Sequence, residues 1–253
     1  VDGLEFLFKP DFSKVNGRVI LEALGQAFFS LSIGMGALIT YGSYISKKDN
    51  LTSSAVIVSF ADTLIAILAG VAIFPAVFAL GGSPASGTGL TYIVLPGIFD
   101  KMPMGSVFSV VFFLLLSIAA LTSTISVLEV IVAYLVEELK MSRKKATVAA
   151  SLSVSVLGVI TVLSFGVFGN ISILDRNLFS FLEFLTSNIM LPVGGLFIVM
   201  FIGWFYSRDL TNDELTSGGL LKGRLIPAFI FIVKFVAPVA IAFVFLYSLG
   251  IIR

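Results

Sequence analysis

The sequence contains no cysteine and no histidine. It therefore cannot form a disulfide framework, a metal site with thiolate or imidazole ligands, a cysteine or histidine nucleophile, or a histidine proton relay. Charged residues are also scarce, at 12% of 253 residues, whereas hydrophobic residues reach 58%. This composition excludes an ordinary soluble domain, in which about 25% of residues are charged. The sixteen Lys and Arg nearly balance the fifteen Asp and Glu, so no basic field for nucleic acid is expected.

Long apolar runs are present instead, each able to cross a hydrocarbon core, which takes about 20 helical residues. They lack the alternating pattern of barrel strands, so we expect an all-α polytopic protein of the cell membrane with six transmembrane helices. The expected segments are a leader at 1–20, a broken first helix at 21–46, helices at 51–80, 105–139, 143–170, 177–207 and 225–252, an external loop or lid at 81–104, and a cytoplasmic loop at 208–224.

The distribution of Lys and Arg predicts the orientation of these helices. The first, third and fifth connections hold nine basic residues, whereas the second and fourth hold only Lys101 and Arg176. We therefore expect the first set of loops to be cytoplasmic and the leader to be extracellular. Three basic residues in the leader point weakly the other way: Lys9, Lys14 and Arg18.

The first expected helix has three glycines and two serines between Gly25 and Gly36, at bilayer depth. Glycine weakens a helix by about 1 kcal/mol relative to alanine. Freed backbone groups at that depth persist only where they face protein or a water-filled cavity. We therefore expect a break near Ser32 to Gly36. The alternative is a continuous helix whose small residues permit close packing.

Asp62 is the single charge in the second apolar run. A carboxylate at this depth costs about 2.5 to 3.5 kcal/mol, so it needs a partner or a function. On a helix it shares a face with small residues, which places it in a helix contact. A bound Na⁺-like cation suits this hard oxygen ligand, and a protonated, hydrogen-bonded Asp62 is the alternative.

Polar residues recur at spacings of three and four in the third apolar run. Serine and threonine alone often bond back to the preceding helical turn. Together with two glutamates, they indicate a solvated pathway. The residues that share this face are Ala119, Thr122, Ser123, Ser126, Glu129, Ala133 and Glu137.

These segments resemble the second half of the sodium-coupled neurotransmitter and amino-acid symporters, bacterial branch. The stretch from Gly25 to Tyr44 is similar to the broken sixth helix of that family, Ala119 to Ser123 to its eighth, and Trp204 to Tyr206 to the end of its tenth. The resemblance implies the second inverted repeat of the bacterial leucine-transporter-like fold plus one extra helix. It also implies a C-terminal fragment that works with a missing N-terminal half, the first repeat.

The family resemblance implies sodium-driven symport of an amino acid by alternating access, with two sodium ions, no organic cofactor and no enzymatic activity. The expected partners are the substrate and the lipid bilayer, and the sequence does not indicate an oligomeric state. The resemblance places Phe29, Ser30, Ser32, Met35, Ser123 and Val127 around the substrate. It assigns Ser30, Asp62, Ala119, Thr122 and Ser123 to sodium, and Tyr44, Glu137 and Glu183 to the gates.

Two positions depart from the family pattern. Met35 stands where relatives usually carry an aromatic residue, and its flexible thioether favours a roomy pocket for hydrophobic or aromatic amino acids. Asp62 aligns best with a position that is asparagine in many relatives. Because animal members need chloride to balance charge there, a fixed carboxylate implies chloride-independent transport. The alternative to a symporter is a non-transporting membrane subunit or receptor of the same architecture.

Overall fold

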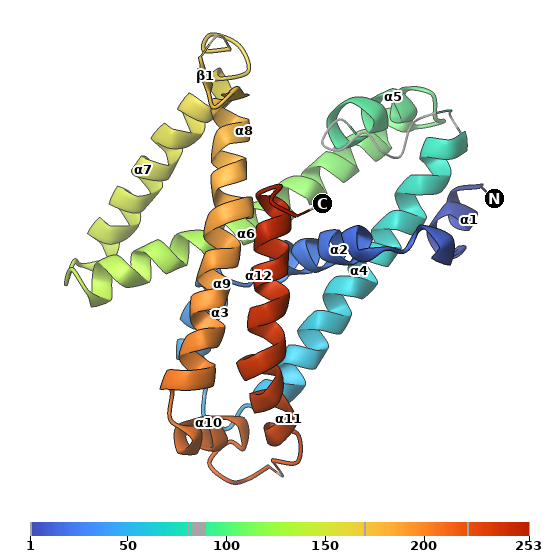
Figure 1. Cartoon of the computed structure of the whole chain (residues 1–253). Helices are drawn as coiled ribbons and strands as arrows, with labels where there is room; N and C mark the ends of the chain where they lie inside the picture. Colours follow the sequence, from blue (N-terminus) through green and yellow to red (C-terminus); the bar gives the residue numbers. More distant parts are fainter. Residues whose placement is uncertain (1, 80, 82–89, 170, 222, 253) are drawn as a thin grey trace. The chain divides into compact units, whose positions relative to one another are not determined.

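Long apolar helices make up most of the protein in the computed structural model (Figure 1), which describes residues 2–79, 81, 90–169, 171–221 and 223–252. Five helical runs in these described residues are long and apolar enough to cross a membrane. The predicted all-α membrane fold is therefore confirmed. The five runs are α4 (Leu51–Ala79), α6 (Gly105–Glu137), α7 (Arg143–Leu163), the run 178–205 and the run 226–248.

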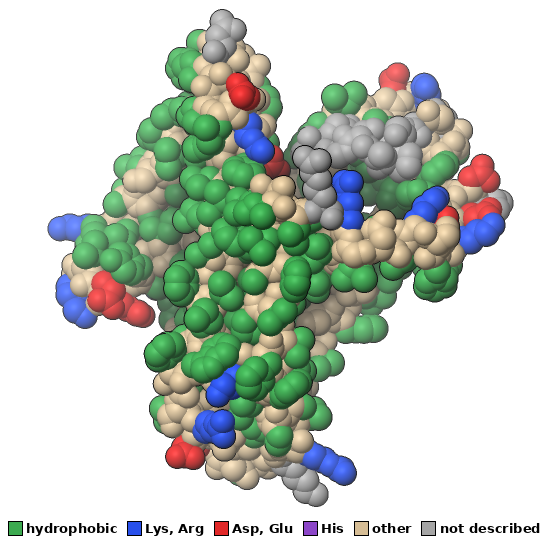
Figure 2. Space-filling view, in the orientation of Figure 1, with side chains coloured by type: hydrophobic (Ala, Val, Ile, Leu, Met, Phe, Trp, Pro, Cys, Tyr) green, Lys and Arg blue, Asp and Glu red, His purple; other side chains and the backbone are tan. Residues whose placement is uncertain are grey.

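The last two runs contain π-helical turns. The run 178–205 consists of α8 (Leu178–Glu183), η3 (Phe184–Met190), α9 (Leu191–Met200) and η4 (Phe201–Phe205). The run 226–248 consists of α11 (Ile226–Phe231), η5 (Ile232–Val236) and α12 (Ala237–Ser248). α9 and α12 lie side by side, and Figure 2 shows hydrophobic side chains over much of their visible faces.

The chain divides into two compact units. The first consists of residues 1–15 and 56–124, and the second of residues 16–55 and 125–253. In the first unit, α1 (Asp2–Phe8) packs against α4. A Cβ on Gly3 would lie 2.6 Å from the backbone carbon of Phe74, and the ring centroid of Phe6 lies 5.2 Å from that of Phe74. The start of the predicted leader is thus a docked helix, followed by the short helix η1 (Phe12–Lys14).

Part of the predicted external lid at 81–104 is helical. η2 (Leu90–Val94) and α5 (Leu95–Asp100) follow α4 in the first unit, and Leu95 and Ile98 form a buried core with Val77. Residues 82–89 of the predicted lid lie outside the described residues.

The first membrane helix of the second unit is broken, as predicted. α2 (Gly17–Ser30) and α3 (Ala37–Tyr44) are separated by six residues in which Ser32, Gly34 and Gly36 have φ angles of 53°, 90° and 81°. These φ values lie in the left-handed region, where glycine carries no Cβ penalty. The side chain of Asn16 caps the start of α2 by accepting a hydrogen bond from the Val19 backbone at 3.1 Å.

The break is packed directly against the backbone of α9. A Cβ on Gly34 would collide with the carbonyl of Leu191 and lie 2.9 Å from the backbone nitrogen of Gly195. A Cβ on Gly194 would in turn lie 2.7 Å from the carbonyl oxygen of Gly34. Because Gly34 faces Gly194 and Gly195, the two backbones approach more closely than side chains at these positions would permit.

The remaining elements of the second unit are short connections. β1 (Ser172–Ile173) and β2 (Arg176–Asn177) form an antiparallel pair after α7, with Ser172 opposite Asn177. α10 (Arg208–Leu215) follows η4. Its Asp213 accepts a hydrogen bond from Lys47 at 3.0 Å and, together with Glu214, raises the pKa of Lys47 above its ordinary value.

Replacing Gly34 by alanine should destabilise the fold. A left-handed φ costs a non-glycine residue about 1 to 2 kcal/mol, and the collision with Leu191 adds to this cost. We expect the free energy of unfolding, measured by denaturation in detergent, to fall by at least about 2 kcal/mol. Gly42→Ala is the matched control, because a Cβ there meets nothing within 4 Å. A Gly34→Ala protein as stable as the Gly42→Ala protein would contradict the assigned contact.

Candidate functional site

The break places opposite helix ends next to each other in the middle of one membrane segment. The end of α2 closes with the Leu31 N–H donating to the Ala27 carbonyl at 3.1 Å, and α3 starts with the Thr40 N–H donating to the Gly36 carbonyl at 2.9 Å. The carboxyl end of a helix attracts cations and the amino end attracts anions. Such an arrangement suits a zwitterion or an ion, as in discontinuous transporter helices.

Four of the predicted substrate residues belong to this region. Phe29 and Ser30 are the last two residues of α2, and Ser32 and Met35 lie in the break itself. Ser32 donates its backbone N–H to the Phe29 carbonyl at 3.1 Å, and Met35 donates to the Ser32 carbonyl at 3.4 Å. The break is therefore a hydrogen-bonded turn of defined shape rather than an open loop.

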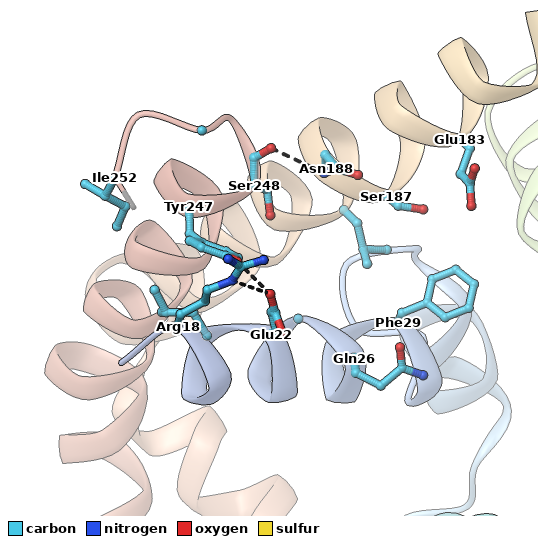
Figure 3. Close-up of a pocket in the computed structure, with 14 residues that line it drawn as sticks. Arg18, Glu22, Gln26, Phe29, Glu183, Ser187, Asn188, Tyr247, Ser248 and Ile252 are labelled. Carbon is cyan, nitrogen blue, oxygen red and sulfur yellow. Dashed lines mark hydrogen bonds and ion pairs between the residues drawn. The ribbon is translucent and has the colours of Figure 1, made fainter. Parts of the chain in front are cut away.

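A cavity of about 710 Å³ in the second unit is lined by Phe29 from α2 and Glu183 from α8 (Figure 3). One predicted substrate residue and one predicted gate residue thus line the same space. Ser30, Ser32 and Met35 are not among its lining residues. The other polar groups that face it include Gln26, Ser187 and Asn188, which sequence reasoning did not single out.

Two hydrogen bonds join different elements around this cavity, and an ion pair within α2 adjoins one of them. Glu22 in α2 accepts hydrogen bonds from Arg18 Nε at 3.0 Å and from the Tyr247 hydroxyl of α12 at 2.7 Å (Figure 3). Asn188 Nδ2 donates to the Ser248 carbonyl at 3.3 Å. The spacing of Arg18 and Glu22, four residues apart on a helix, is a sequence signal for this pair. Nothing in the sequence pointed to Tyr247.

A second polar cluster fixes the end of α3. The Glu129 carboxylate of α6 accepts a hydrogen bond from the Tyr44 hydroxyl at 2.9 Å and two from Arg143 Nη2, each at 2.8 Å. The Tyr41 hydroxyl donates to Ser126 Oγ at 3.0 Å. Only 16% of the Glu129 side chain is exposed. The cost of a carboxylate in an apolar helix is thus offset by a cation and a hydroxyl.

The sequence itself carries a signal for this cluster. Tyr41 and Tyr44 are three residues apart, as are Ser126 and Glu129, so each pair occupies one helix face. Tyr44 was predicted as a gate together with Glu137, but in the described residues no hydrogen bond or ion pair joins these two. Glu137 is the exposed last residue of α6, about two turns beyond Glu129.

The predicted sodium ligands other than Ser30 lie in the first unit. The Thr122 hydroxyl of α6 donates to the Ala119 carbonyl at 2.7 Å, so two of the predicted oxygen ligands adjoin each other. Ser123 follows Thr122 in α6, and Val127 lies one turn later, in the part of α6 that belongs to the second unit. Asp62 lies half-buried in α4.

The described residues contain no group of three or more His, Cys, Asp or Glu side chains able to hold a metal ion. The predicted sodium ligands are hydroxyl and backbone carbonyl oxygens together with the Asp62 carboxylate, and oxygen ligands of this kind fit a hard ion such as sodium.

The model of the sodium:neurotransmitter symporter family matches residues 1–252. The chain belongs to this family. It is 38% identical over 250 residues to a sodium-dependent transporter of Haemophilus influenzae and 34% identical over 252 residues to the sodium-dependent transporter YhdH of Bacillus subtilis. These matches cover 98% and 100% of the chain, and 54% and 56% of the two relatives, respectively.

The fold also matches that of a solved structure. The crystal structure of MhsT in complex with L-phenylalanine matches with a TM-score of 0.85 at 46% sequence identity, over 98% of this chain and 56% of MhsT. The predicted leucine-transporter-like fold is confirmed. The predictions of a multi-pass membrane protein and of a family of transporters rather than enzymes are confirmed as well. The chain spans about half the length of the relatives that it matches.

Tyr44 and Glu129 should contribute to stability as a coupled pair. Tyr44→Phe removes one hydrogen bond and should lower the free energy of unfolding by about 1 kcal/mol, whereas Glu129→Gln weakens both bonds to Arg143 and should lower it by about 1.5 to 3 kcal/mol. Because both changes act on one carboxylate, the double variant should lose less than the sum, by about 0.5 kcal/mol or more.

Denaturation in detergent measures these losses. Tyr134→Phe is the matched control, since Tyr134 lies in α6 with 59% of its surface exposed, and it should change stability by less than about 0.5 kcal/mol. Strictly additive effects of Tyr44→Phe and Glu129→Gln would contradict the coupling.

Proposed function

We propose that this protein is a sodium-coupled symporter of hydrophobic or aromatic amino acids. The observation that carries the proposal is the break between α2 and α3, with its left-handed turn at Ser32 to Gly36, in a chain of the sodium:neurotransmitter symporter family. The phenylalanine named in the MhsT structure, at 46% sequence identity, supports the substrate class. Met35 supports it too, because a flexible thioether adapts to large apolar side chains.

In this proposal the substrate binds at the break. The ammonium group faces the carboxyl end of α2, and the carboxylate faces the amino end of α3, where the helix dipoles favour these charges. Phe29, Met35 and Val127 supply apolar contacts to the substrate side chain, and the hydroxyls of Ser32 and Ser123 orient its polar groups.

Two sodium ions provide the driving force in the proposed mechanism. Ser30 and Asp62 contribute to the first ion site, and the Ala119 carbonyl with the Thr122 and Ser123 hydroxyls forms the second. Moving one charge through a membrane potential of 100 mV is worth about 2.3 kcal/mol. Two ions can therefore concentrate a zwitterion strongly.

Alternating access follows from movement of the broken helix relative to its surroundings. Glu183 acts at the external side, where it lines the cavity next to Phe29. Tyr44 and Glu137 act at the internal side. The contact of Tyr44 with the ion pair of Glu129 and Arg143 supports this role, because breaking and forming such a cluster can distinguish two conformations.

Uptake of phenylalanine should require both sodium and the assigned ligands. For the protein expressed from its complete coding sequence in proteoliposomes, uptake of labelled phenylalanine should fall to background when choline replaces sodium. The combined Ser123→Ala and Asp62→Ala variant should lose at least about tenfold in uptake at a fixed sodium concentration, since it removes one ligand from each proposed ion site.

Ser117→Ala is the control for this experiment, because Ser117 lies in α6 and donates to the Phe113 carbonyl at 2.7 Å, away from the assigned ligands. Uptake that persists in choline would refute sodium coupling. Wild-type uptake by the double variant would refute the ligand assignment, and no uptake of any amino acid would favour a non-transporting subunit.

Transport should not require chloride. In this proposal Asp62 supplies the fixed negative charge that balances the sodium ions, so replacing chloride by gluconate at constant sodium should leave phenylalanine uptake unchanged. The Asp62→Asn variant should acquire a chloride requirement, because it removes the negative charge of the side chain and keeps its shape. Loss of phenylalanine uptake by the wild-type protein when gluconate replaces chloride would contradict the assignment of the balancing charge to Asp62.

A further inference from the structure

Lys234 carries a charge within the apolar run 226–248, which has no other charged residue. A lysine within a membrane segment costs about 2.5 to 3.5 kcal/mol at the centre, which marks it as a candidate functional residue. It lies eight residues after Ile226, the start of α11, or about 12 Å along the helix axis. Its long side chain can reach the interface from that depth.

The backbone around Lys234 is shaped for a close approach of two helices. Lys234 lies in the π-helical turn η5, and the facing segment η4 is also π-helical. A Cβ on Gly203 of η4 would lie 3.2 Å from the Cα of Lys234. π-Helical turns within membrane helices often occur at functional sites, and here two of them meet at one lysine.

The Lys234 ammonium group lies near aromatic rings rather than carboxylates. Its nitrogen is 5.9 Å from the centre of the Trp204 ring and 5.8 Å from that of Phe235. Among the described residues of its unit, neither Lys234 nor Arg208 forms an ion pair. The rings stabilise the cation but do not neutralise it, so the positive charge remains available to an anion.

A pocket of about 220 Å³ opens at this position. Its polar lining comes from Trp204, Tyr206, Arg208, Thr211 and Lys234. Sites for drug-sized molecules measure about 300 to 1,000 Å³, so this pocket is matched to a smaller group. Lys234 and Arg208 give the pocket two cations. An ammonium group and a guanidinium group, the second with several hydrogen-bond donors, are the side-chain groups that typically bind a phosphate.

We propose that this pocket binds the phosphate of an anionic phospholipid. Trp204 and Tyr206 are residue types typical of the membrane–water interface, and the exposed rings of Phe231 and Phe235 continue along α11 and η5, where acyl chains can pack. Lys234 is closer to the start of the run 226–248 than to its end, and this start directly follows the predicted cytoplasmic loop 208–224. Basic pockets between helices on the cytoplasmic side favour anionic headgroups. This lipid site does not depend on the proposed transport function.

Native mass spectrometry tests the proposal on the protein expressed from its complete coding sequence and purified in detergent. Titration with phosphatidylglycerol should give a first bound lipid at lower concentration than titration with phosphatidylcholine. Lys234→Gln and Arg208→Gln should each weaken phosphatidylglycerol binding about fivefold, as expected for one cation near an anionic headgroup. Lys234→Arg should retain it.

Arg176→Gln is the matched control. Arg176 also lies over an aromatic ring, 4.0 Å from the centre of Phe184, but at the opposite end of the run 178–205, so its loss should not change phosphatidylglycerol binding. Arg208 is an exposed residue at the start of α10, so its variant tests the site even when Lys234→Gln impairs folding. Equal affinity for the two lipids, unchanged binding in Arg208→Gln, or displacement of the lipid by inorganic phosphate at equal concentration would each overturn the proposal.

Discussion

The backbone contact between Gly34 and α9 is the constraint on which the candidate site depends. A membrane helix can stop in the apolar layer only where its freed backbone groups are enclosed by protein or line a cavity. Here the enclosure is provided by Leu191, Gly194 and Gly195, which leave no room for a side chain on either backbone. The left-handed turn at Ser32 to Gly36 is thereby held between two helix ends whose dipoles face the same space.

Polar clusters outside the break hold the two half-helices. α2 is joined near its start to α12 through Glu22 and Tyr247, and α3 is joined near its end to α6 and α7 through Tyr44, Glu129 and Arg143. Charge-assisted hydrogen bonds of this kind are directional and are either formed or broken, so they can distinguish discrete arrangements of the elements that they join. In the proposed transport cycle these clusters give each half-helix a defined position on each side of the break.

Local features of the sequence predicted the break, because three glycines and two serines at bilayer depth act on the backbone directly. The composition likewise predicted a helical membrane protein. The partners of Glu22 and Glu129 were not predicted, since Tyr247 lies 225 residues from Glu22 and Tyr44 lies 85 residues from Glu129. The docking of α1 on α4 was missed for a similar reason, because Gly3 reveals its role only once Phe74 is placed beside it. The assignments of sodium ligands and gates remain predictions.

Equilibrium binding of phenylalanine in sodium and in choline tests the central claim most directly, namely that the broken helix forms a site shared by an amino acid and sodium. For the purified protein expressed from its complete coding sequence, sodium should raise the affinity for phenylalanine by about 5- to 150-fold, and phenylalanine should raise the affinity for sodium by the same factor. Equal affinity for phenylalanine in the two salts would contradict the account.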